Sequence, residues 1–187
     1  MITVLTLLSL SCILSYTLAV CLKFRGIPAS ISASFYSLQH KYWFRFTMWL
    51  TPMLLMPAIL EISDTNTQWL AYLACVGMIV VGCFPDYTGD KFYYRGHVAG
   101  AVITMVSSQV WVAFHAPVLL TAWALWLVYT MYSIYGYMDN KIEERGYEAD
   151  GDFIQGFYSS KPLFWVEIFS LFTTYYSVLS YCITQIK

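Results

Sequence analysis

Six long apolar segments make up most of this 187-residue chain and limit what it can fold into. A helix that crosses a lipid bilayer needs about 20 consecutive, mostly apolar residues. Because backbone polar groups find no water inside the bilayer, segments of this kind are expected to be helical. The segments cover residues 2–22, 42–60, 69–84, 96–114, 117–138 and 162–184. We therefore predict an all-α integral membrane bundle of six transmembrane helices, forming one domain over residues 1–187.

The composition agrees with a membrane protein and excludes a soluble domain and a nucleic-acid-binding protein. Hydrophobic residues make up 59% of the chain and charged residues only 11%, whereas about 25% of the residues of a soluble protein are charged. Ten basic residues nearly balance eleven acidic ones, so no broad positive field attracts a polyanion. We expect membrane lipid as the partner and no nucleic acid, with a homo-oligomer or a larger membrane complex as alternatives.

The lysine and arginine residues predict the orientation of the bundle, because cytoplasmic loops carry an excess of them. Nine of the ten lie in or beside the first, third and fifth loops between the predicted spans, and only Lys187 lies on the other side. Both termini are therefore predicted on the outer side, with the plasma (inner) membrane as the expected location. No basic residue precedes the first apolar run, which favours a retained span over a cleaved signal peptide.

The histidine and cysteine residues show no metal-binding pattern. His97 and His115 lie at opposite ends of one predicted span, about 27 Å apart at 1.5 Å per residue. The five cysteines include no Cys-x-x-Cys pair, and buried free cysteines behave as small hydrophobic residues. We therefore expect neither a metal nor a cofactor.

Polar residues within the predicted spans mark a candidate site, because ionisable groups at membrane depth are costly. Glu167 lies about five residues into the last span, and polar residues continue from it at helical spacing. A second stripe begins at His97 on the fourth span. The stripes are Glu167, Ser170, Thr174 and Ser177 on the last span and His97, Ala101, Thr104 and Ser108 on the fourth.

The predicted topology brings the inner ends of three spans into one leaflet. Asp86, at the end of the third span, is expected to converge with His97 and Glu167, with Arg95 nearby. Such a cluster could bind a lipid headgroup or a metal, relay protons, or only fix the packing of the helices.

The first inner loop, residues 24–36, adds Ser30 and Ser32 to these candidate ligand-binding residues. It mixes apolar and hydroxyl side chains and carries no charge after Arg25. A free linker would be more polar, so we expect the loop to lie in the interface or to fold over the cluster as a lid.

Four short motifs lie at residues 27–32 (Ile-Pro-Ala-Ser-Ile-Ser), 82–85 (Gly-Cys-Phe-Pro), 97–101 (His-Val-Ala-Gly-Ala) and 165–167 (Trp-Val-Glu). Their order resembles the Frag/DRAM/Sfk-type six-span integral membrane proteins and related uncharacterised bacterial six-span proteins. That resemblance implies a role in lipid or glycolipid handling and membrane regulation, with no agreed catalytic activity. It also makes His97 and Glu167 shared polar positions without assigned roles.

Three functions are compatible with these observations. The first is non-catalytic binding of a lipid or another amphiphile at the polar cluster near the cytoplasmic side. The second is an intramembrane metal-dependent lipid hydrolase that uses the same residues. The third is a small transporter or a structural subunit of a membrane complex.

Overall fold

The computed structural model describes residues 1–145 and 152–184, with only the backbone described at 141–145, 152 and 153. The described residues form helices joined by turns, which confirms the all-α class. The α-helices are α1 (Ile2–Phe24), α2 (Tyr42–Ile62), α3 (Gln68–Cys83), α4 (Lys91–His115), α5 (Ala122–Arg145), α6 (Asp152–Ser159) and α7 (Pro162–Thr184). Two short 3-10 helices are η1 (Ser32–Tyr36) and η2 (Pro117–Thr121).

Five segments are long and apolar enough to cross a bilayer, so the chain is a multi-pass helical membrane protein. They are α1, α2, α4, the segment Pro117–Asn140 and α7. The helix α3 has 16 residues, which corresponds to about 24 Å at 1.5 Å per residue. A sixth crossing by this shorter helix stays a prediction.

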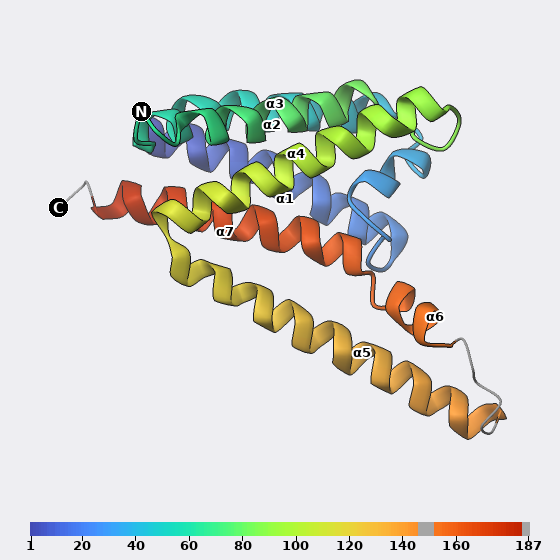
Figure 1. The fold of residues 1–187 in the computed structure, drawn as a ribbon. Helices are drawn as coiled ribbons and strands as arrows, with labels where there is room; N and C mark the ends of the chain where they lie inside the picture. The colour runs from blue at the N-terminus through green and yellow to red at the C-terminus, as the bar shows by residue number, and fades with distance from the viewer. Residues whose placement is uncertain (146–151, 185–187) are drawn as a thin grey trace.

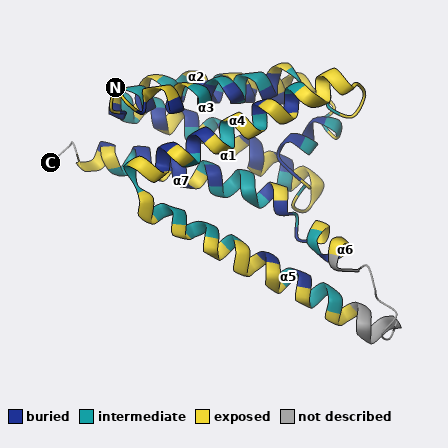
Figure 2. Ribbon diagram, viewed as in Figure 1, coloured by how far each residue is buried: buried dark blue, intermediate teal, exposed yellow. Residues whose placement is uncertain are grey.

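The long helices run in alternating directions, and the start of α1 and the end of α7 lie at the same end of the molecule (Figure 1). Helices α1 to α4 pack in sequence order, and α7 packs against α1, α2 and α4. The helix α5 contacts α7 near its start and then diverges from the bundle (Figure 1). Accordingly, much of its surface is exposed (Figure 2).

The core lies among α1, α2, α3, α4 and α7, where one face of each helix is buried. Its largest fully buried side chains include Trp111, Phe44, Ile13, Ile59 and Val178. Many leucines, valines and aromatic residues on the opposite faces are exposed. In a bilayer those exposed apolar faces contact lipid chains rather than water.

The helix α4 begins five residues earlier than the predicted span, at Lys91. The carboxylate of Asp90 accepts a hydrogen bond of 3.1 Å from the backbone N–H of Phe92, which caps the helix. The capping residue explains why Arg95 lies inside this helix rather than in the loop before it.

Helices α3 and α4 cross closely because two glycines face each other. A Cβ atom at Gly77 would lie 2.8 Å from the carbonyl oxygen of Gly100, and one at Gly100 would lie 2.9 Å from that of Gly77. Small residues at such positions let helix backbones approach in a membrane. This approach holds the α4 face described below against α3.

We predict that Gly77→Ala destabilises the protein, because the added methyl group must push α3 away from α4. Overpacking of this kind costs about 1–3 kcal/mol, which thermal unfolding in detergent, followed by circular dichroism, would measure. The control is Gly136→Ala in α5, where a Cβ atom meets nothing within 4 Å. Equal loss of stability in both variants would contradict the close crossing.

Candidate functional site

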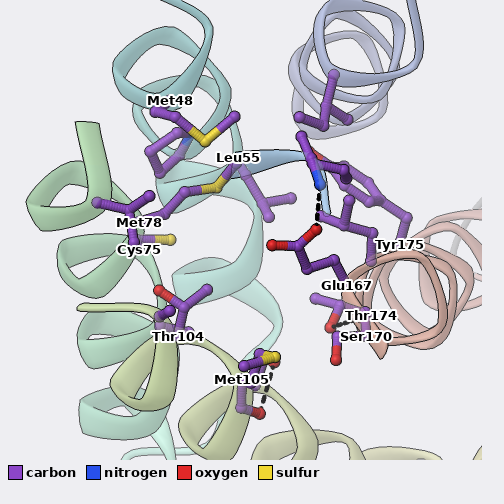
Figure 3. A pocket seen from close by; sticks show the side chains of 18 of the residues that line it. Met48, Leu55, Cys75, Met78, Thr104, Met105, Glu167, Ser170, Thr174 and Tyr175 are labelled. Atoms are coloured by element: carbon purple, nitrogen blue, oxygen red, sulfur yellow. Dashed lines mark hydrogen bonds between the residues drawn. The ribbon is translucent and has the colours of Figure 1, made fainter. Parts of the chain in front are cut away.

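A cavity of about 110 Å³ lies inside the bundle, between α2, α3, α4 and α7 (Figure 3). Residues three or four positions apart line it, so each helix contributes one face. These residues are Ala101, Thr104, Met105 and Ser108 on α4 and Glu167, Ser170, Leu171 and Thr174 on α7. The polar stripes noted in the sequence of the fourth and last spans therefore border the same cavity over most of their length.

The helices α2 and α3 provide the apolar wall. Met48 and Leu55 of α2 and Cys75 and Met78 of α3 lie opposite α7 (Figure 3). Methionine side chains are flexible and adapt to irregular shapes. The cavity thus combines an adaptable apolar wall with hydroxyl and carboxyl groups on α4 and α7.

Glu167 is the ionisable carboxyl group of this cavity, and its side chain points into it from α7 (Figure 3). The Oε2 atom accepts a hydrogen bond of 2.5 Å from the backbone N–H of Ile31. The Oε1 atom accepts a longer hydrogen bond of 3.3 Å from Oγ of Ser32. Ile31 directly precedes η1, so Glu167 satisfies N–H groups that a helix start leaves unpaired.

Further contacts hold the first loop against the bundle. The Tyr16 hydroxyl of α1 and Oγ of Ser34 in η1 are 2.6 Å apart, and the backbone N–H of Phe164 in α7 donates to the carbonyl oxygen of Ala29 over 3.2 Å. The buried ring of Phe35 in η1 packs edge-on against the ring of Phe44 in α2. Because Ile31 and Ser32 also line the cavity, the loop contributes to its wall.

Two hydrogen-bond networks fix the helices that form the walls. Oε1 of Gln109 in α4 accepts hydrogen bonds of 3.0 Å from Nε1 of Trp123 in α5 and from Oγ1 of Thr173 in α7. The hydroxyl groups of Ser9 in α1 and Tyr175 in α7 are 2.5 Å apart. These networks hold α7 against α1 and α4 along the length of the cavity.

His97 is buried, but it serves the connection between α3 and α4 rather than the cavity. Its Nδ1 lies 2.8 Å from the carbonyl oxygen of Phe84, and a carbonyl oxygen can only accept, so Nδ1 carries the hydrogen. Its ring packs on Tyr87 with the centroids 4.4 Å apart. The structure does not place His97 among the cavity residues.

Asp86 and Arg95 are both exposed, and in the described part of the chain neither makes a hydrogen bond or ion pair with Glu167. Asp86 follows Pro85 in the turn after α3, outside the bundle. Arg95 lies two residues from His97 on α4, which turns it about 200° away from that buried side chain. In the described residues, Asp86, Arg95 and His97 make no direct contact with Glu167, and Ser32 is the candidate residue that contacts it.

Sequence reasoning did not identify Tyr87, which connects several of these groups. Its ring contacts those of His97 and Tyr36, while the backbone N–H of Thr88 donates to the Tyr36 hydroxyl over 2.9 Å. Burial raises the pKa of the Tyr87 hydroxyl, and a hydrogen bond with Ser30 partly opposes this rise. A tyrosine at the end of a span looks like an interface anchor, so its sequence position gave no signal.

Ser170 of α7 carries a buried hydroxyl group that has no hydrogen-bond partner among the described residues. Its side chain is only 6% exposed. A buried hydroxyl without a partner costs about 1–3 kcal/mol. One turn from Glu167 on the same face of α7, Ser170 is therefore a candidate contact for a bound polar group.

A metal-centred site has no counterpart in the described residues. No three histidine, cysteine, aspartate or glutamate side chains come together there in a way that could hold a metal ion. The arrangement around Glu167 instead offers hydrogen-bond acceptors beside an apolar wall.

We predict that Glu167→Ala releases the first loop, because Ile31 and Ser32 lose their acceptor on α7. Backbone amides at residues 31–36 should then exchange hydrogen for deuterium faster, as measured by mass spectrometry. Glu61→Ala is the control, since Glu61 is an exposed glutamate of α2. If the exchange at residues 31–36 stays unchanged in Glu167→Ala, these hydrogen bonds do not hold the loop.

Comparison with known proteins adds no assignment to this geometry. No protein-family model, curated protein or solved structure gives a significant match to the chain. The resemblance to the Frag/DRAM/Sfk-type proteins stays a prediction, and the proposals below depend on the cavity itself.

Proposed function

We propose that this multi-pass membrane protein binds a lipid or another amphiphile in the cavity between α2, α3, α4 and α7, without catalysing a reaction. The polar head would lie beside Glu167 and Ser32, and the apolar part along Met48 and Met78. The observation that carries this proposal is a carboxyl group directed into an otherwise largely apolar cavity. Ligand sites in proteins commonly combine an apolar lining with a few polar groups that orient the ligand.

The size of the cavity limits the ligand. An engineered apolar cavity of about 150 Å³ in another protein binds benzene, so about 110 Å³ corresponds to a small ring or a short piece of chain. A lipid with two chains would therefore insert only its head or part of one chain. A single-chain amphiphile fits this description better than a bulky phospholipid.

The buried hydroxyl of Ser170 supports a bound molecule over an empty cavity. Its Oγ has no partner among the described residues, and rotation about χ1 moves a serine hydroxyl between staggered positions. A polar head beside Glu167 would lie within one helical turn of this group. The same ligand could thus satisfy both side chains.

Simple observations separate the hydrolase and structural-subunit alternatives from ligand binding. A metal-dependent hydrolase needs further metal ligands beside Glu167, and the candidate histidine, His97, is not among the residues that line the cavity. A structural subunit would need a partner surface, for which the exposed helix α5 is available. Purification as a monomer without associated subunits would count against that alternative.

We further propose that the chain crosses the plasma (inner) membrane six times, with α3 as the short sixth span. Both termini then lie on the outer side of this membrane. The alternating helix directions and the common position of the start of α1 and the end of α7 support an even number of crossings (Figure 1). Nine of the ten basic residues then lie on the cytoplasmic side.

This topology predicts that epitope tags at both ends are accessible to antibody in intact cells. A tag inserted after Gly89, between α3 and α4, should become accessible only after the membrane is permeabilised. Opposite accessibility of the two terminal tags would contradict six crossings. Accessibility of the internal tag alone would reverse the orientation.

We predict that Ala101→Leu reduces the amount of lipid that copurifies with the protein, because the larger side chain fills the cavity. Mass spectrometry of gently purified protein would measure the molar ratio of bound amphiphile, and we expect at least a fivefold loss. The matched control is Ala99→Leu, two residues away on the exposed side of α4. Equal retention in Ala101→Leu and the wild type would contradict binding in this cavity.

A further inference from the structure

We infer that the cavity selects its ligand by hydrogen-bond polarity and takes a single-chain amphiphile with a protonated amine head. This inference rests on the proposed function and specifies the ligand class of the same site. It follows from which polar atoms border the cavity and from how their hydrogens are already used.

The charge of the cavity wall has one sign. Glu167 is the acidic residue of the lining, and the described residues that line the cavity include no lysine, arginine or histidine. A carboxylate inside a membrane protein needs an opposite charge or hydrogen-bond donors close to it. An ammonium head would supply both, whereas an anionic head would place two like charges together.

Three hydroxyl groups of the wall have used their hydrogens within their own helices, whereas the Ser170 hydroxyl has no partner among the described residues. Oγ1 of Thr104 donates to the carbonyl oxygen of Gly100 over 2.8 Å, and Oγ1 of Thr174 donates to that of Ser170 over 2.8 Å. On the same wall, Oγ of Ser108 donates to a backbone carbonyl oxygen over 3.1 Å. Each hydroxyl oxygen can still accept hydrogen bonds, so these groups turn acceptors toward a ligand.

Glu167 has unused acceptor capacity as well. A carboxylate offers about four lone-pair positions, and three donors bind Glu167: the backbone N–H of Ile31, Oγ of Ser32 at 3.3 Å and the backbone N–H of Ser32. About one position of the carboxylate therefore remains for a donor on a ligand. Charge-assisted hydrogen bonds are shorter and roughly twice as strong as neutral ones.

The donor numbers of different head groups then rank the ligands. An ammonium head brings three N–H donors and a positive charge, an alcohol brings one donor, and an ionised carboxylate brings none. The cavity of about 110 Å³ leaves room for this head and the beginning of one chain. An alkylamine should therefore bind more tightly than the alcohol of equal length, and the fatty acid should bind least.

Cys75 provides a reporter inside the site. It lines the cavity opposite Glu167 (Figure 3), while Cys83 at the end of α3 is exposed. The rate of thiol modification by methyl methanethiosulfonate, resolved by peptide mass spectrometry, would report occupancy at Cys75 and bulk reactivity at Cys83. Dodecylamine, dodecanol and dodecanoate would be compared at equal micellar mole fraction with purified full-length protein.

We expect dodecylamine to slow the modification of Cys75 at least tenfold, dodecanol to slow it less, and dodecanoate to have no effect. In Glu167→Gln the advantage of the amine over the alcohol should disappear, while Glu61→Gln should behave as the wild type. Thr104→Val removes one acceptor and should lower the amine advantage by a smaller factor. This second variant keeps the test available if Glu167→Gln fails to fold.

Two results would overturn the inference while leaving amphiphile binding in place. These are equal protection by the three compounds and an unchanged amine preference in Glu167→Gln. Absence of protection by all three compounds would also overturn the proposed function. Equal slowing at Cys75 and Cys83 would assign the effect to the micelle and contradict selection in the cavity.

Discussion

The hydrogen bonds between Glu167 and the first loop connect parts of the chain that lie 136 residues apart in sequence. Inside a membrane a backbone N–H and a carboxyl group both need hydrogen-bond partners. Here the N–H of Ile31 donates to the carboxylate of Glu167, so each group is the partner of the other. The contact positions η1 against α7 and keeps Glu167 beside the cavity. The cavity wall, the remaining acceptor position of Glu167 and the proposed ligand site all depend on this contact.

The rest of the bundle supports this contact by different means. The close approach at Gly77 and Gly100 holds α4 against α3, and Gln109 joins α4 to α7 by hydrogen bonds. These contacts fix the backbones of α3, α4 and α7 relative to one another, while the methionine side chains of α2 and α3 can adapt to a ligand. A rigid acceptor-rich wall facing an adaptable apolar wall is suited to select a head group and tolerate variation in the chain.

Much of the arrangement could be predicted from sequence, because it follows from periodicity. The spacing of Glu167, Ser170 and Thr174 identified one face of the last helix, and the helical class followed from the apolar segments. The partners of Glu167 could not be predicted in this way. The cap at Asp90 extends α4 so that Arg95 lies within the helix, and Tyr87 contacts His97 through ring packing that no motif indicates.

An experimental density map of the protein extracted with its native lipids would test directly whether an amphiphile occupies the cavity. We expect elongated density within the cavity, with its head about 3 Å from a carboxylate oxygen of Glu167, a normal hydrogen-bond distance. A cavity that contains only ordered water, or that closes with Glu167 contacting another protein side chain, would contradict it.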